Sequence, residues 1–192
     1  MSFKNKMFFL LFIILIASSV FAEEFNVDKS KNNMVKFISD APIENFEGIT
    51  DKIDGYLYFE NGDFTNNSEI YFEVELNSLD TGIGLRNRHM RENYLHTDKY
   101  PITHYTGKII KSIKKSDTEI LVETEGKIYI HGITKPLNVK GKINEIDKNT
   151  YQIKTQFIVA LSEFEIEIPS IMFYKIDENM DLQLDFYVKK YN

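Results

Sequence analysis

The sequence predicts an all-β protein of about eight antiparallel strands, on three observations. Apolar and polar residues alternate along most of the chain after residue 22, so each run has one apolar and one polar face. Turn-forming clusters such as Asn61-Gly62-Asp63 and Asp147-Lys148-Asn149 separate the runs. One long segment, residues 78–105, departs from the alternation. The pattern permits a closed barrel or a two-sheet sandwich, because both bury one face of each strand.

The run over residues 69–77 shows the alternation most clearly. Its apolar side chains Ile70, Phe72, Val74 and Leu76 share one face, while the residues between them are mostly acidic. The inward faces of the other expected strands are Val35 and Phe37; Ile53, Gly55, Leu57 and Phe59; Thr103, Tyr105, Gly107 and Ile109; Ile120, Val122, Thr124, Gly126, Ile128 and Ile130; Leu137, Val139, Gly141 and Ile143; Tyr151, Ile153, Thr155, Phe157, Val159 and Leu161; and Leu182, Leu184, Phe186 and Val188. Residues 43–49 predict a short helix or turn whose Phe46 packs inward.

The segment SLDTGIGLRNRHMRENYLHTDKYPITHY, residues 78–105, predicts a short helix between two strands. The helix is expected from Leu85 to about Leu95, and Tyr100-Pro101 is expected to end it because a residue before proline disfavours the helical region. A helix inserted into an otherwise all-β chain indicates a lid over one end of a barrel.

The first 22 residues predict a cleavable signal peptide. Lys4 and Lys6 precede the apolar run Met7–Ile16, and cleavage is expected before Glu23. An apolar run of this length is too short to span a bilayer. The expected mature domain, residues 23–192, is therefore periplasmic or secreted, although the signal does not distinguish the two.

Composition limits the possible functions of the mature domain. About 170 residues suffice for a single core, and the chain has no cysteine, which excludes disulfides and thiolate metal sites. The formal net charge is −6 and the pI is about 5.3, which argues against a general nucleic-acid binder. The sequence leaves the oligomeric state open.

Several spaced motifs resemble the signature of the YceI-like family. They are Ser78-Leu79, Thr81-Gly82, Arg86, His89-Met90-Arg91, Lys99-Tyr100-Pro101, Tyr105, His131-Gly132-Ile133-Thr134-Lys135-Pro136 and Glu167-Ile168-Pro169. The resemblance extends from about Phe25 to the C-terminus. It implies an eight-stranded antiparallel lipocalin-like β-barrel with a short helical lid, in a periplasmic or secreted protein that binds polyisoprenoids or other long lipids. The chain departs from the family pattern at Asn87, where aspartate is common, and at Thr103 and His104.

The expected inward face contains almost no ionisable side chain, which suits an apolar tail better than catalysis. The residues predicted to bind the tail are Leu57, Phe59, Phe72, Val74, Leu76, Met90, Tyr94, Tyr105, Ile120, Val122, Phe157 and Phe186. The same pattern is compatible with a filled core. Small inward residues such as Gly126 and Gly141 favour a hollow one, although barrels also need glycine to bend their strands.

The lid carries the densest group of cations in an acidic chain. We predict that Arg86, His89 and Arg91 meet an anionic headgroup at the mouth of the barrel, because the arginine fork pairs with such groups in bidentate fashion. The alternative is a solvated helix face. Transient contact with a membrane surface is compatible with either reading.

No metal site, cofactor or catalytic group is predicted. His89, His96, His104 and His131 lack close ligand spacing, and no nucleophile elbow is present. The leading expectation is therefore a carrier or buffer of a long isoprenoid or other apolar lipid. One alternative is an enzyme acting on a small apolar molecule, with Tyr105 and His104 as candidate groups. The other is a stress-related interaction module with a solid barrel and the outward tyrosines Tyr56, Tyr58, Tyr71 and Tyr129 as a partner surface.

Overall fold

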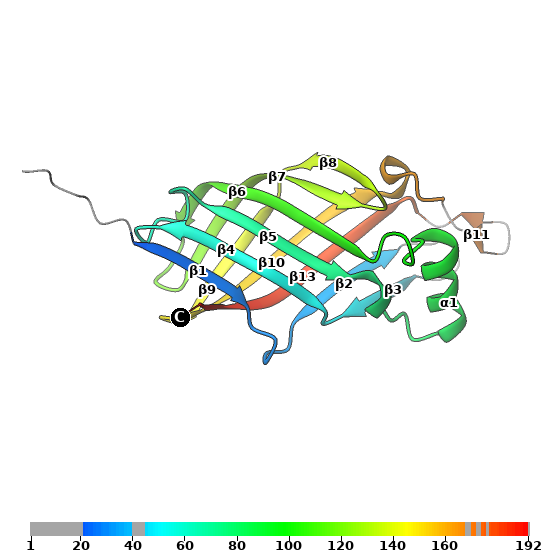
Figure 1. Ribbon diagram of the computed structural model, residues 1–192, viewed down its shortest axis with the longest axis horizontal. Coiled ribbons are helices and arrows are strands. Elements are labelled where there is room, and N and C mark those ends of the chain that lie inside the picture. Colours follow the sequence, from blue (N-terminus) through cyan, green and yellow to red (C-terminus); the bar gives the residue numbers. More distant parts are fainter. Residues whose placement is uncertain (1–20, 40–44, 168–169, 172–173, 176, 192) are drawn as a thin grey trace, which may run out of the picture.

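A computed structural model describes residues 21–39, 45–167, 170–171, 174–175 and 177–191. Most of the expected signal peptide, residues 1–20, lies outside the described residues. The strands are β1 (Ala22–Val27), β2 (Met34–Ser39), β3 (Phe46–Thr50), β4 (Ile53–Glu60), β5 (Glu69–Glu75), β6 (Ile102–Lys114), β7 (Glu119–Ile130), β8 (Ile133–Leu137), β9 (Lys140–Asp147), β10 (Thr150–Ala160), β11 (Ser170–Ile171), β12 (Tyr174–Lys175) and β13 (Asn179–Lys190). All their pairings are antiparallel (Figure 1).

The main sheet closes on itself. Pairing runs in the order β1, β4, β5, β6, β7, β9, β10 and β13, and it returns from β13 to β1, where Val27 pairs with Val188. Closure removes the unpaired edges that an open sheet of this size would present. The structure therefore confirms the eight-stranded barrel and excludes the sandwich.

Three of the eight strand positions are interrupted. β1 and β2 pair with successive stretches of β13, and β3 and β4 continue one another beside them. β8 and β9 likewise pair with successive stretches of β7. Within the described residues β8 pairs with β7 alone, so the wall between β8 and β10 lacks main-chain pairing near the lid.

The helix or turn expected over residues 43–49 is wrong for its described part, because Phe46–Thr50 forms strand β3 against β2. The edge of β2 needs a partner, and Gly48 allows a close approach: a Cβ built there would lie 2.2 Å from Cε1 of Phe37. Phe46 still packs inward, edge-on to Phe37 with ring centroids 6.0 Å apart.

The lid helix is confirmed. It consists of α1 (Gly84–His89) and a π-helical turn, η2 (Met90–Tyr94), and a short 3₁₀ turn, η1 (Leu76–Ser78), precedes it. Figure 1 shows α1 at one end of the barrel. The expected terminator is wrong, because the helix ends at Tyr94, with Leu95 as its C-cap, and the chain reverses at His96, whose φ is 45°. The break therefore comes well before Pro101.

The opposite end of the barrel is filled by aromatic rings. Phe59 packs between Phe25 and Phe64 at centroid distances of 5.6 and 4.4 Å, and Tyr151 contacts Phe25 and Phe64 at 4.9 and 5.5 Å. Such pairs contribute roughly 0.5–1.5 kcal/mol each beyond their burial. We call these four residues the aromatic plug. A hydrophobic molecule inside the barrel therefore meets a solid floor at this end.

The described helices include none with the length and apolar character that crossing a membrane requires.

Candidate functional site

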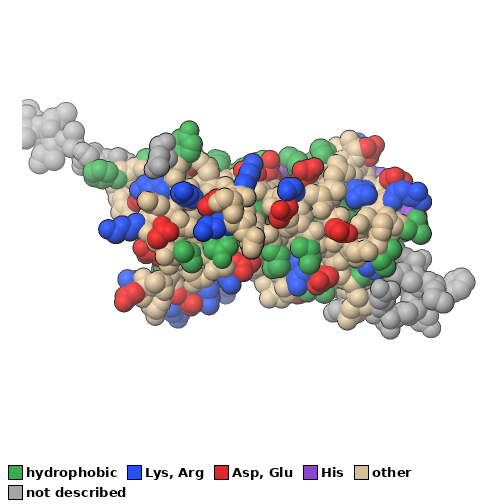
Figure 2. All heavy atoms as spheres, turned by 90° about the horizontal axis from the view of Figure 1, so that it is seen from below, with side chains coloured by type: hydrophobic (Ala, Val, Ile, Leu, Met, Phe, Trp, Pro, Cys, Tyr) green, Lys and Arg blue, Asp and Glu red, His purple; other side chains and the backbone are tan. Residues whose placement is uncertain are grey.

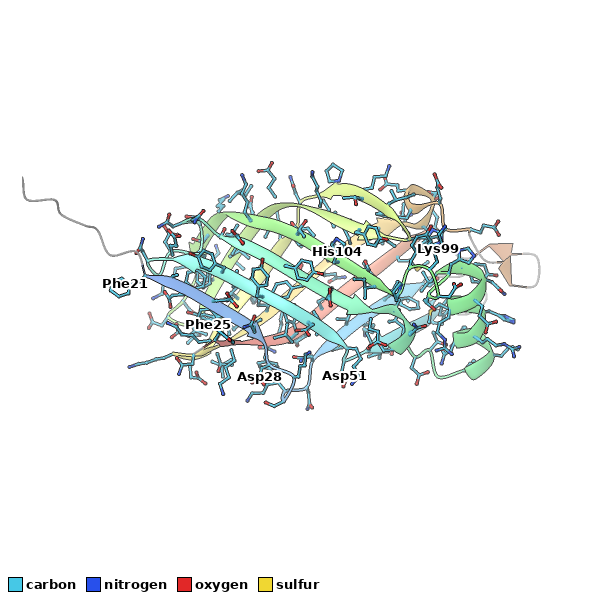
Figure 3. The ribbon with its side chains drawn as sticks, viewed as in Figure 1. Phe21, Phe25, Asp28, Asp51, Lys99 and His104 are labelled. Atoms are coloured by element: carbon cyan, nitrogen blue, oxygen red, sulfur yellow. The ribbon has the colours of Figure 1, made fainter. Side chains whose placement is uncertain are left out.

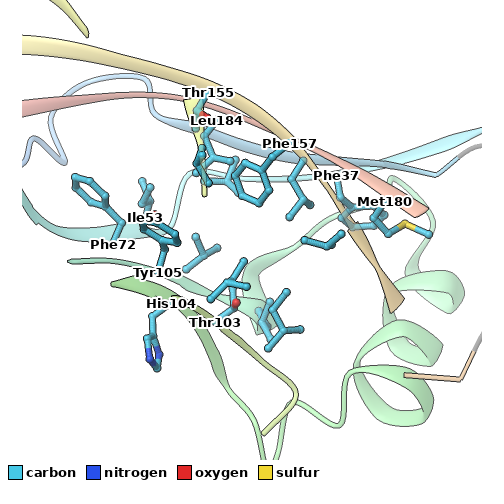
Figure 4. A pocket seen from close by; sticks show the side chains of 18 of the residues that line it. Phe37, Ile53, Phe72, Thr103, His104, Tyr105, Thr155, Phe157, Met180 and Leu184 are labelled. Atoms are coloured by element: carbon cyan, nitrogen blue, oxygen red, sulfur yellow. The ribbon is translucent and has the colours of Figure 1, made fainter. Parts of the chain in front are cut away.

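A cavity of about 400 Å³ occupies the barrel between the aromatic plug and the lid. Its volume falls in the range of roughly 300–1,000 Å³ that is usual for small-molecule sites. Figure 4 shows Phe37, Ile53, Phe72, Phe157 and Leu184 around this space. The wall is almost entirely hydrophobic because alternate residues of every strand point inward.

Ten of the twelve residues predicted to bind the tail line the cavity. They are Leu57, Phe72, Val74, Leu76, Met90, Tyr94, Tyr105, Val122, Phe157 and Phe186. The other two, Phe59 and Ile120, do not line the cavity: Phe59 belongs to the aromatic plug, and Ile120 packs against the core cluster that contains Phe59. Whether any of these side chains contacts a ligand stays a prediction.

The cavity also contains residues that the sequence prediction omitted. Val35 and Phe37 on β2 alternate in the expected phase and could have been included. Leu161 and Ile166 belong to or follow a 3₁₀ turn, η3 (Leu161–Phe164), and Leu79 follows η1. Leu161 continues the inward alternation expected for residues 151–161 and could have been included, whereas Leu79 and Ile166 carried no periodic signal because they lie outside the strands.

Arg86 and His89 line the cavity from the lid, whereas Arg91 does not. The Arg86 guanidinium donates from Nε to Thr81 Oγ1 at 3.0 Å and from Nη2 to the Thr81 carbonyl at 2.8 Å. It also lies over the Phe46 ring, 4.7 Å from the centroid. Arg91 donates to the Asn77 carbonyl at 3.4 Å instead. Two of the three predicted headgroup residues therefore lie at the mouth.

One polar group lies deep in the apolar wall. The Tyr105 hydroxyl is 2.7 Å from Thr124 Oγ1 and donates to the Leu137 carbonyl at 3.2 Å. Burial raises the pKa of Tyr105, so the group stays a neutral phenol near neutral pH. This hydroxyl can take part in hydrogen bonds, but it supplies no charge to the lumen.

Two glycines let the Tyr105 ring lie flat against the wall. A Cβ at Gly126 would lie 2.4 Å from the Tyr105 oxygen and 2.4 Å from the Thr106 carbonyl oxygen, and one at Gly107 would lie 3.0 Å from the same hydroxyl. The small inward residues noted in the sequence therefore do make room, here for a tyrosine ring.

His104 is among the residues around the cavity, but its ring points outward, as its strand phase predicts. Figure 4 shows its ring on the far side of β6 from the lumen. The ring stacks between Tyr71 and Tyr129, at centroid distances of 5.7 and 4.8 Å. The two groups considered for an enzyme, Tyr105 and His104, therefore lie on opposite faces of the barrel wall and cannot act on one substrate.

A histidine pair joins the end of the lid to the β7–β8 turn. His131 Nδ1 is 3.0 Å from the Phe164 carbonyl oxygen, and its Nε2 is 2.8 Å from His96 Nδ1. A carbonyl only accepts, so His131 donates from Nδ1, and its Nε2 accepts from His96. This contact also connects the turn to η3 across the unpaired wall between β8 and β10. Within the described residues, no group of three His, Cys, Asp or Glu side chains could hold a metal.

The fold and this cavity define a class of protein: closed antiparallel β-barrels with an apolar lumen open at one end, as in lipocalin-like proteins. Comparison with known proteins gives the family. The chain belongs to the YceI-like family, whose domain matches residues 25–188. Among curated proteins, no sequence matches this chain.

Solved structures support the fold. BcnA from Burkholderia cenocepacia aligns with a TM-score of 0.69 and 15% identity, over 84% of this chain and 98% of BcnA. A polyisoprenoid-binding domain from Saccharophagus degradans, implicated in plant cell wall breakdown, aligns with a TM-score of 0.68 and 13% identity, over 88% and 98% of the two chains. The Campylobacter jejuni YceI protein aligns at 0.60 with 15% identity, over 76% and 85%.

Proposed function

We propose that this protein binds a long isoprenoid-type or other apolar lipid in the barrel and acts as its carrier or buffer. The observation that carries the proposal is the cavity of about 400 Å³ with a hydrophobic wall, floored by the aromatic plug and bordered by Arg86 and His89 at the lid. Family membership and the polyisoprenoid-binding neighbour support the same class of ligand.

The energetics favour exchange over permanent capture. Moving a hydrocarbon chain from water into the barrel gains roughly 0.8 kcal/mol per CH₂. A membrane offers such a chain an equally apolar surrounding, so the net free energy of transfer from membrane to barrel is small. The headgroup and the lid then determine whether the lipid moves from membrane to barrel or back, as a carrier or buffer requires.

The proposed headgroup contacts are Arg86 and His89, which face the cavity, with Arg91 as an outer contact near Asn77. An anionic or strongly polar headgroup would replace part of the water around these side chains while the tail lies below. The separation of Tyr105 from His104 gives no reason to propose an enzyme. The cavity likewise argues against a solid barrel that acts only through its outer tyrosines.

Export through the signal peptide belongs to the proposal. Cleavage before Glu23 removes Ala22, the first residue of β1, and leaves Glu23 with its 2.8 Å ion pair to Lys190. The barrel keeps its closing strand after cleavage. Sequencing the N-terminus of protein recovered from the periplasm or the medium tests this step and its site.

Adjacent residues on β10 provide the test of lipid binding. Phe157 lines the cavity, whereas the side chain of Ile158 is 63% exposed on the outer face. Phe157→Glu places a carboxylate in the lumen and should abolish retention of lipid, while Ile158→Glu adds the same charge outside and should change nothing. Organic extraction and mass spectrometry of the purified proteins measure the lipid, and circular dichroism checks folding. The proposal would be overturned if folded Phe157→Glu retained as much lipid as wild type. It would also be overturned if wild type contained no lipid and did not bind lipid added to it.

A further inference from the structure

The lid has two faces, and the lipid-binding proposal uses one of them. Arg86, His89, Met90 and Tyr94 recur at helical spacing and line the cavity. The residues between them face away from the lumen. In α1 the described side chains include none that is fully buried, so the barrel core does not account for the composition of this outer face.

The outer face begins with two exposed hydrophobic side chains. Ile83 is 48% exposed and Leu85 is 55% exposed, and they precede the exposed Arg88 on the same short segment. Ile49, also exposed, lies at the base of the segment, because its main chain pairs with that of Asp80 at 2.9 and 3.0 Å. Single exposed hydrophobic residues are ordinary, but here three gather at the mouth of the barrel.

Basic side chains lie beside these hydrophobic ones. Within the described residues, neither Arg88 nor Arg91 has a carboxylate within ion-pairing distance. Arg91 is only half-exposed and donates to the Asn77 carbonyl, whereas Arg88 is exposed. Figure 2 shows Lys and Arg side chains next to hydrophobic ones at the end of the molecule that carries the lid. Figure 3 places Lys99 at that end as well, with Phe21 at the opposite end.

Exposed aliphatic side chains beside an exposed arginine match the interface of an anionic bilayer. The aliphatic groups enter the boundary between headgroups and acyl chains, and the cations meet phosphates. We infer that the outer face of the lid, formed by Ile83, Leu85 and Arg88, is a docking surface for an anionic lipid bilayer. Its use rests on the proposed lipid binding, because docking by the lid brings the mouth of the cavity to the membrane that holds the lipid.

Flotation with lipid vesicles tests the docking surface. The full mature protein is mixed with vesicles of phosphatidylcholine alone or of phosphatidylcholine with phosphatidylglycerol. Wild type should float with the anionic vesicles and far less with the neutral ones. Ile83→Ser/Leu85→Ser should weaken flotation at least about tenfold. Arg88→Gln should weaken it about fivefold and reduce the preference for anionic vesicles, which corresponds to about 1 kcal/mol for one cation.

Matched controls come from the opposite end of the barrel. Ile146 is 51% exposed, and Lys148 is exposed in the β9–β10 turn, so Ile146→Ser and Lys148→Gln remove the same kinds of side chain away from the lid. These variants should float like wild type. The inference is overturned if wild type binds neither kind of vesicle, or if the lid variants float no less than the controls. Lipid retention, measured by extraction from the same preparations, is a separate readout, so a barrel that holds lipid but ignores vesicles overturns docking alone.

Discussion

The side-chain amide of Asn87 on the lid helix donates a hydrogen bond to the Asp80 carboxylate at 2.7 Å. Asn87 Oδ1 accepts at the same time from the main-chain N–H and the hydroxyl of Thr81, at 2.8 and 2.6 Å. The bond from Asn87, with a second from the Gly82 N–H, holds the pKa of Asp80 below its ordinary value. This one amide therefore fastens α1 to the segment that leads into it, and it does so because it can both donate and accept.

Asn87→Asp should loosen the lid. The aspartate that is common in the family at this position would face the Asp80 carboxylate and lose the donor, while still accepting from Thr81. We expect amide hydrogen exchange over residues 84–95 to become several-fold faster near neutral pH, with little change in the barrel strands. Asn93→Asp is the matched control, since Asn93 is exposed on the same lid, and it should leave the exchange unchanged. Equal exchange in the two variants would contradict this role of Asn87.

Gly126→Ala should destabilise the barrel by about 1–3 kcal/mol, because the new Cβ meets both the Thr106 carbonyl and the Tyr105 ring. The ring is pushed into the lumen, so the amount of lipid retained should also fall. Gly84→Ala is the control, because a Cβ there meets nothing within 4 Å and alanine favours the helix. Urea unfolding should show no loss of stability for Gly84→Ala. A Gly126→Ala protein as stable as wild type would show that the Tyr105 ring and the neighbouring main chain can shift to make room for the methyl group.

Local alternation predicts which face a residue occupies, but not its depth along the barrel axis. Phe59 and Phe72 have the same inward phase on neighbouring strands, yet one lies in the floor and the other lines the cavity. The difference comes from cross-strand register, which pairs Leu57 with both Phe25 and Ile70. Register depends on partners far away in the sequence, so alternation alone predicts the same tail site for Phe59 and Phe72.

The mouth of the barrel could be predicted only in part for a related reason. The lid helix has its own local signal, and the range predicted from it, Leu85 to about Leu95, agrees with the observed range 84–94 to within about a residue. The contact of His131 with His96 and with the Phe164 carbonyl joins three segments that lie far apart in sequence. Two of these residues, His96 and His131, have positive φ, which no pattern of hydrophobic residues indicates. Tertiary geometry determines this part of the site.

Tyr105→Phe should cost about 1 kcal/mol of stability, because it removes the hydroxyl from Thr124 and from the Leu137 carbonyl inside an apolar wall. Tyr58→Phe is the control, since the Tyr58 hydroxyl bonds Glu60 on the outer surface, and its effect should be much smaller. Urea unfolding compares the two. A purely apolar tail should still bind to Tyr105→Phe. Loss of all lipid from this variant would instead indicate that the hydroxyl itself contacts the ligand.

Stability should fall as the pH rises from about 10 to about 12, and two tyrosines account for the direction. The hydrogen bond to Glu73 raises the pKa of Tyr71 to about 12, and burial raises that of Tyr151 to about 12. In the unfolded chain both titrate near 10, so between these values the unfolded state has lost protons that the folded state keeps. The stabilisation that these two raised pKa values provide is therefore complete below about pH 10, and it disappears as the pH rises through the folded-state pKa.

Tyr71→Phe and Tyr151→Phe should each reduce this alkaline loss, measured as the change in urea midpoint across that range. Each should also remove one late-titrating tyrosine from the ultraviolet absorbance titration of the folded protein. Tyr191→Phe is the control, because Tyr191 is 69% exposed near the C-terminus, and it should leave the pH dependence of the urea midpoint as in wild type. If the midpoints of all three variants fall with pH as steeply as that of wild type, these two hydroxyls do not govern the alkaline limit of the barrel.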